Sequence, residues 1–338
     1  LSENLDRGED LLKVLRFEFG ILFNRPDISA AEEVARSFYK KAVVDAHPAS
    51  RAMGHQAMGK VHFFRGEFPQ ARKEMIESLS YEETIRSNDL LTHYQYPVAA
   101  MVYQAFSSYC LGHFAESRAV SDKALEISRE SSQFTHSLTL ANILILEMMQ
   151  KGSDRTDALH HELSKLAFAR GAPFWVDLVG FHDGVSAAQK GDYETAVARM
   201  RRALLTFEQN SVEVEIPYYQ TVLAEVLLEA KRDSEAQTLL DDARIRIDRT
   251  QERWPLAEVL RLSMVCAVHH DDQSKAQELK HDAHRVCSEQ GAKTWSLRLE
   301  ATAAKLGIGN PAKISTMLQS FDEPPPKFDL ELAGRFAQ

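Results

Sequence analysis

Residues 184–207 read Gly-Val-Ser-Ala-Ala-Gln-Lys-Gly-Asp-Tyr-Glu-Thr-Ala-Val-Ala-Arg-Met-Arg-Arg-Ala-Leu-Leu-Thr-Phe. This stretch predicts a helical hairpin, because Gly191 stands in a Lys-Gly-Asp turn that ends one helix and Tyr193 begins the next. Gly184 allows the two helices to approach closely. Small and apolar residues then share one face of the second helix: Ala196, Met200, Ala203, Leu204 and Phe207. A hairpin cannot bury such a face alone, so the stretch predicts stacked hairpins.

Variants of this hairpin recur along nearly the whole chain. A small residue early in each second helix marks the units at Ala31, Ala71, Ser117, Asp157 (or its neighbour Ala158), Ala196, Ala236 and Ala276. Successive gaps are 40, 46, 40, 39, 40 and 40 residues. Such regular spacing predicts an all-α solenoid of about seven hairpins with no internal domain boundary. We expect the array to cover residues 1–306, followed by an extension over 307–338 that holds a short helix and a Pro-rich segment.

Composition excludes several classes of protein. The 338 residues are 44% hydrophobic and carry a formal charge of −9, which argues against a nucleic-acid surface. No apolar run approaches the roughly 20 residues that a membrane-spanning helix needs. Three cysteines without Cys-x-x-Cys spacing indicate a reducing cytoplasm. The chain begins at Leu1 without a signal-peptide pattern, so we expect a piece of a longer product.

The units fit the tetratricopeptide pattern, with a period about six residues longer than the standard of about 34. That pattern implies a right-handed superhelix with a concave inner surface. Four motifs carry a closer resemblance: Gly54-His-Gln-Ala-Met-Gly59, Gly171-Ala-Pro-Phe-Trp175, Glu215-Ile-Pro-Tyr-Tyr219 and Glu252-Arg-Trp254. With them, residues 10–306 resemble the C-terminal tetratricopeptide region of large bacterial signal-transducing ATPases. Members of that family often carry a class III adenylate or guanylate cyclase domain, or a winged-helix domain, upstream.

We find no catalytic constellation in the sequence. The stretch from Gly54 to Lys60 has the glycines and lysine of a phosphate-binding loop, but Val61 replaces the Ser or Thr that would hold magnesium, and no strand precedes it. His281, His284 and Cys287 could share one side of a helix as metal ligands, yet a solvated face beside acidic residues is the favoured interpretation. We therefore expect no enzyme activity, no cofactor and no metal.

Aromatic side chains are the candidate contacts for a partner. Trp175 and Trp254 stand where one hairpin passes to the next, and Tyr218 and Tyr219 lie in one of the family motifs. They either wedge between hairpins and set the superhelical pitch, or line the groove and anchor a ligand. Tyr94 and Tyr96 lie in the irregular insertion of residues 79–97 and are the first place to expect a binding contact.

These observations predict a regulatory or scaffolding repeat module of a larger cytoplasmic signalling protein. We expect the concave face to bind a protein segment or an upstream domain of the same polypeptide. The alternative is a small-ligand sensor that holds an effector between hairpins with Trp175, Tyr218 and Tyr219. The sequence leaves the oligomeric state open, a homo-oligomer included.

Overall fold

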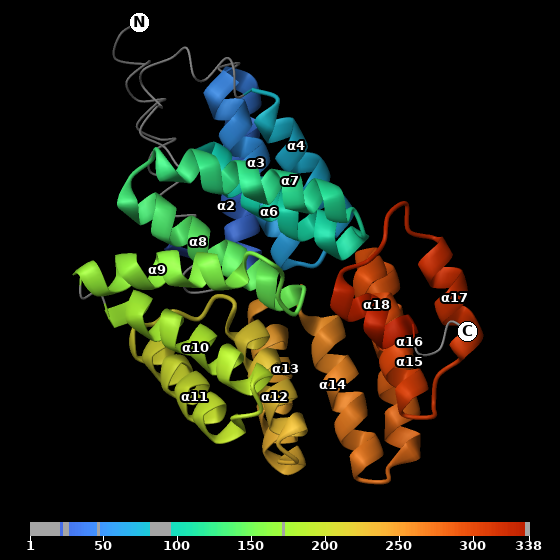
Figure 1. The fold of residues 1–338 in the computed structure, drawn as a ribbon. Coiled ribbons are helices and arrows are strands. Elements are labelled where there is room, and N and C mark those ends of the chain that lie inside the picture. Colours follow the sequence, from blue (N-terminus) through green and yellow to red (C-terminus); the bar gives the residue numbers. More distant parts are fainter. Residues whose placement is uncertain (1–20, 23–26, 46–47, 82–95, 171–172, 335–338) are drawn as a thin grey trace, which may run out of the picture.

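Consecutive helices pair into hairpins along the chain (Figure 1). This computed structural model describes residues 21–22, 27–45, 48–81, 96–170 and 173–334. The helices are α2 (Ile28–Asp45), α3 (Pro48–Phe64), α4 (Phe68–Leu79), α6 (Tyr96–Leu111), α7 (Phe114–Arg129), α8 (Gln133–Met149), α9 (Thr156–Arg170), α10 (Pro173–Gln189), α11 (Tyr193–Gln209), α12 (Ile216–Glu229), α13 (Asp233–Thr250), α14 (Leu256–His269), α15 (Gln273–Gln290), α16 (Lys293–Lys305), α17 (Pro311–Gln319) and α18 (Lys327–Gly334). Every regular element within those residues is a helix, which confirms the predicted all-α solenoid.

The hairpins are α3 with α4, α6 with α7, α8 with α9, α10 with α11, α12 with α13 and α14 with α15. The first 20 residues of the predicted array lie outside the described residues. None of the helices that the structure describes combines the length and apolar character needed to cross a bilayer.

The predicted repeat register agrees with the observed packing. Six of the seven marker residues are almost fully buried: Ala31, Ala71, Ser117, Ala196, Ala236 and Ala276. Asp157 and its neighbour Ala158, which mark the weakest unit, are exposed because a charged carboxylate is costly to bury without a partner. Gly191 has a φ of 81° at the turn between α10 and α11, where a residue with a side chain would be strained. An added Cβ at Gly184 would lie 3.0 Å from the carbonyl oxygen of Ala196, so the close helix contact requires glycine.

The two helices of each hairpin differ in how much of their surface is buried. Along α12, twelve side chains are buried, whereas α13 buries only the face that carries Ala236, Leu240, Ala243, Ile247 and Thr250. A helix that is apolar on all sides needs neighbours on all sides. The first helices of the hairpins therefore form the inside of the solenoid, and the second helices form its outside.

The solenoid closes on itself, so part of its inner surface is filled. The backbone N–H groups of Arg253 and Trp254 donate to the carbonyl of Phe64, at 2.7 and 3.2 Å, and α16 packs against α6. Figure 1 shows the last helices next to the α6–α7 hairpin. The sequence predicted a concave surface, but between the first and last repeats aromatic rings occupy its axis. Apolar inner faces that meet across a tight superhelix bury more surface than an open groove would.

The extension beyond the array holds two helices, α17 and α18, on either side of the segment Pro324–Pro326. Both pack against α16, and Ile314 and Ala333 are fully buried beside Leu297 and Ala301 of that helix. The C-terminal segment thereby lies on the repeat array, with α18 beside α16 (Figure 1).

His182 of α10 makes stability depend on pH. The side chain is buried, and its Nε2 has no hydrogen-bond partner among the described residues. Burial, with a smaller contribution from His160, lowers the pKa of His182 from 6.5 to about 3. Because the folded-state pKa is lowered, this stability is fully present above pH 6.5 and is lost as pH falls towards 3. We expect unfolding at pH 5 to cost about 2 kcal/mol less than at pH 7.5 through this group alone.

Urea denaturation of wild type and His182→Phe at both pH values measures this difference. The variant should lose that part of the pH dependence, while His281→Gln, a change at an exposed histidine, should keep it. Equal pH dependence in wild type and His182→Phe would contradict the prediction.

Candidate functional site

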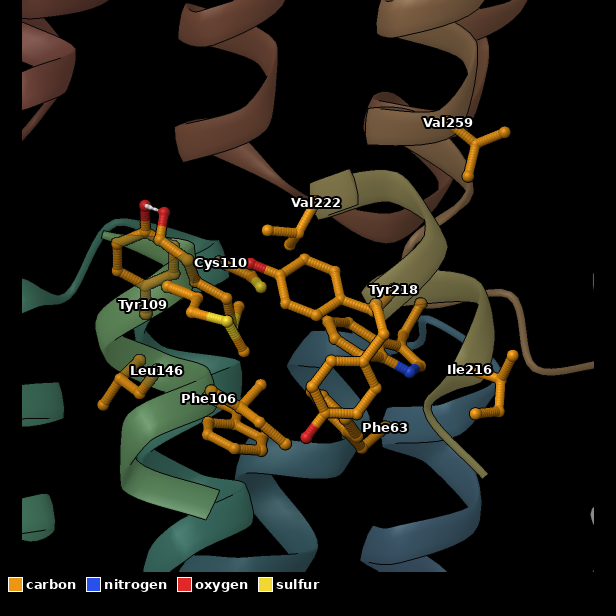
Figure 2. Packing of buried hydrophobic residues seen from close by; sticks show 14 of the residues in the cluster. Phe63, Phe106, Tyr109, Cys110, Leu146, Ile216, Tyr218, Val222 and Val259 are labelled. Carbon is orange, nitrogen blue, oxygen red and sulfur yellow. Dashed lines mark hydrogen bonds between the residues drawn. The ribbon is translucent and has the colours of Figure 1, made fainter. Parts of the chain in front are cut away.

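Three of the predicted contact residues belong to the core. Trp254 is fully buried, and Tyr218 and Tyr219 are each 4% exposed. The Trp254 ring centroid lies 4.7 Å from that of Tyr218 and 5.3 Å from that of Phe63. Figure 2 shows Phe63, Phe106 and Tyr218, which come from distant parts of the sequence, pointing towards one another. In this conformation these aromatic residues are packed between helices of different hairpins.

The other predicted contacts lie elsewhere. Trp175 of α10 is half-buried, and its ring lies 6.2 Å from that of Phe134. Tyr96 begins α6, where only its backbone is described, and Tyr94 lies outside the described residues. The structure therefore does not bring the six predicted residues together into one site. Their roles as contacts for a partner stay predictions.

The motifs weighed for chemistry lie in repeat helices. The stretch from Gly54 to Lys60 is helical within α3. His284 of α15 pairs with Glu300 of α16 at 2.8 Å, beside a cavity of about 500 Å³ that Lys313 also lines. Among the described residues, no group of three His, Cys, Asp or Glu side chains is placed to hold a metal ion.

A different cluster stands out on the inner side of the last three repeats. Consecutive inner helices each carry charged residues among their buried positions: Glu225 in α12, Glu258 and Arg261 in α14, and Arg298 in α16. Arg261, Arg298 and Glu258 are 5%, 2% and 4% exposed. Buried charges are costly unless they are paired, so the ion-pair partners of these side chains show what this face can bind.

Arg298 is the centre of the cluster. Its Nε and Nη2 donate to the two carboxylate oxygens of Asp329 in α18, at 2.8 and 3.0 Å. Nη2 also donates to the hydroxyl of Tyr109 and to the carbonyl of Met149, both at 2.9 Å, and Nη1 lies 3.3 Å from Glu258. Such a two-point Arg–carboxylate pair is specific in geometry as well as strong. One side chain therefore joins the first repeats, the last repeats and the C-terminal helix.

Arg261 links the two glutamates of the cluster. Its guanidinium donates to both oxygens of Glu258, at 2.9 and 3.0 Å, and to Glu225 at 3.0 Å. Burial alone would raise the pKa of Glu225, but Lys151 and Arg261 lower it far below its usual range. In the same way, burial opposes but Arg261 and Arg298 lower the pKa of Glu258. Both carboxylates are therefore ionised at neutral pH.

An aromatic ring of α18 completes the site. The Phe328 ring centroid lies 5.3 Å from the guanidinium carbon of Arg298 and 5.9 Å from the ammonium of Lys151, which also pairs with Glu225. Cations over an aromatic face attract the ring quadrupole, more strongly where water is excluded. Phe328 and Asp329 thus make paired apolar and ionic contacts with the same guanidinium.

A cavity of about 410 Å³ lies beside α18. Apolar residues of α12, α14, α16 and α18 line it, among them Leu228, Leu262, Val265, Leu306, Phe328 and Leu332. Its exposed rim carries Glu229, Lys231, Lys305 and Glu331, whose formal charges cancel. The inner face of the last three repeats is therefore a groove that α18 occupies only in part.

The sequence held a signal for this cluster that reasoning on aromatic residues missed. Glu225, Arg261 and Arg298 recur at intervals of 36 and 37 residues, close to the repeat period, and each lies in an inner helix. Charges at equivalent positions of consecutive buried helices indicate a paired network across the repeats.

Comparison with known proteins gives the following. No family model matches the chain, and no curated protein matches it. Among solved structures the chain is similar to the one described as the crystal structure of the apo form of RapI, with a TM-score of 0.42 and 12% identity. The likeness covers 97% of this chain and 96% of that one. The resemblance to the repeat region of signalling ATPases stays a prediction from the sequence motifs.

Proposed function

We propose that this chain is a non-catalytic regulatory module that binds a helical protein segment on the inner face of α12, α14 and α16. The segment belongs to a partner or to another domain of the same polypeptide. The observation that carries the proposal is that this face already holds a helix, α18, through a buried ion pair and aromatic contacts. Helix-in-groove binding uses the same combination of apolar burial and fixed polar anchors.

The charged residues of the site support binding rather than catalysis. Arg261, Arg298 and Lys151 are each paired with a carboxylate, so none is poised as a free acid or base. The motifs near Gly54, Glu215 and Glu252 support placing the module in a cytoplasmic signalling protein with cyclase-linked or transcription-linked ATPase domains. A bound segment would regulate such domains only if it contacted their two states differently.

The second candidate function is a small-ligand sensor. The cavity of about 410 Å³ favours it, since pockets of roughly 300–1,000 Å³ hold small molecules. Trp175, Tyr218 and Tyr219, the residues expected to hold an effector, do not line this cavity or the one beside His284. A protein segment therefore has the stronger support.

A peptide library displayed on phage and panned against the purified chain tests the proposal. We expect selected helical peptides to bind at least tenfold more weakly to Lys151→Glu, because this change reverses a charge that contacts Glu225 of the groove and the ring of Phe328. Lys275→Glu, which alters an exposed lysine of outer helix α15, is the matched control and should leave binding unchanged. Selected peptides that bind both variants equally would place the interaction elsewhere, and a retained metabolite without peptide binding would favour the sensor.

A further inference from the structure

We infer that α18 is an internal stand-in for the partner, and that the partner's segment presents an aromatic residue followed by a carboxylate on a short helix. Phe328 and Asp329 make these contacts within the chain. The inference rests on the proposed function and names the chemistry of the segment that the inner face accepts. It also means that the partner must displace α18 in order to bind.

Charge complementarity explains why the bound segment needs a carboxylate. Without α18, the cluster holds three cations, Lys151, Arg261 and Arg298, but only two carboxylates at ion-pair distance from them, Glu225 and Glu258. Asp329 supplies the third negative charge and is itself 1% exposed. A segment that leaves Arg298 unpaired would bury an uncompensated charge, which is strongly unfavourable. An acidic residue is therefore required at this position of any segment that replaces α18.

The position that Phe328 occupies in α18 favours an aromatic residue in the partner's segment. Phe328 lies over both Arg298 and Lys151, at 5.3 and 5.9 Å. An aliphatic side chain of similar size would fill the space but would lose the attraction between the cations and the ring face. Beyond Phe328 the groove keeps a cavity of about 410 Å³, so a segment with larger apolar residues would fill it better than α18 does.

The way α18 is attached suits a helix that can be displaced. It has only eight residues, and isolated helices shorter than about 12–15 residues are marginal in water. The segment just before it is fixed, because the Phe321 ring packs 5.6 Å from that of Phe114 and the Glu323 carboxylate accepts from the backbone N–H of Ala115 at 2.7 Å. A released α18 would stay tethered at an effective concentration of about 1 mM, the scale for short linkers.

The test uses a fluorescein-labelled synthetic peptide with the sequence of residues 322–334, titrated with the whole chain and followed by fluorescence anisotropy. Wild type is compared with the double variant Phe328→Ala/Asp329→Asn, whose own α18 is weakened. We expect the double variant to bind the peptide at least tenfold more tightly. Adding Lys151→Glu should abolish that gain, and a peptide with the same Phe→Ala and Asp→Asn changes should not bind.

Hydrogen exchange of residues 327–334 keeps the result interpretable, and it should show faster exchange in the double variant. Equal peptide affinity for wild type and double variant would overturn the inference, as would unchanged protection of α18. A different outcome is that panned peptides bind wild type and the double variant equally and remain sensitive to Lys151→Glu. That result would support the proposed function and contradict the competition by α18. If α18 is released but neither wild type nor the double variant binds any peptide at this face, the proposed function is contradicted as well.

Discussion

Arg298→Met should lower the free energy of unfolding by about 3 kcal/mol, the low end of the range for breaking a buried ion pair. The substitution removes the guanidinium that pairs with Asp329 and lies 3.3 Å from Glu258. The loss stays at the low end for two reasons. Release of α18 would expose the Asp329 carboxylate to water, and Glu258 keeps Arg261 as a partner. Urea denaturation measures the loss, and hydrogen exchange should show that α18 loses protection first.

Arg285→Met is the matched control for this prediction. Arg285 also pairs with two carboxylates, Asp282 and Glu289, but its side chain is 53% exposed. Solvent screens such pairs, so the control should cost far less than Arg298→Met. Adding Asp329→Leu to Arg298→Met should recover much of the stability, since apolar replacement of a whole buried pair is often nearly neutral. Equal losses in Arg298→Met and Arg285→Met would show that the cluster is not buried in solution.

Trp254→Ala should have the largest effect of any single substitution proposed, a loss of about 4 kcal/mol or more. The side chain is fully buried where the first and last repeats meet, against Phe63, Tyr218 and Trp295. Removing it leaves a cavity lined by side chains from several inner helices, and the cost increases with the cavity volume that stays unfilled. Its indole N–H also donates to Glu252 at 2.9 Å, so a buried carboxyl group loses a donor.

Two further variants separate these contributions. Trp254→Phe removes the N–H and part of the ring system, and should cost less than Trp254→Ala because Glu252 keeps the backbone N–H of Glu215 as a donor. Trp175→Ala, at a half-buried position on α10, should cost less than Trp254→Ala because less apolar surface leaves the interior. A loss for Trp175→Ala as large as that for Trp254→Ala would mean that the closure near Trp254 contributes little to stability.

The sequence predicted the repeat architecture well, because local patterns decide it. The buried marker at Ala196 and the turn at Gly191 follow from helix periodicity and turn chemistry within one hairpin. Stacking of neighbouring hairpins then follows from their need to bury one face each.

The site could not be predicted in the same way. Arg298 meets Tyr109 across 189 residues and Asp329 across 31, and no periodic pattern states how tightly a superhelix winds. Aromatic residues such as Trp254 looked available for a partner because hairpin junctions are accessible in an open solenoid. Closure of the array buries them and leaves the groove beside α18 instead. In the sequence, only the charged residues within α12, α14 and α16 indicated the ion-pair cluster beside α18.

The closure between Phe64 and Trp254 also has a consequence during synthesis. The inner faces of α3 and α6 pack against residues that are synthesised about 190 residues later. At a synthesis rate of about 5–20 residues per second, this interval is about 10–40 s. Throughout that time the nascent chain presents the rings of Phe63 and Phe106, which are fully covered only in the finished protein. The early repeats should therefore depend on chaperones at the ribosome in a way that an open repeat array would not.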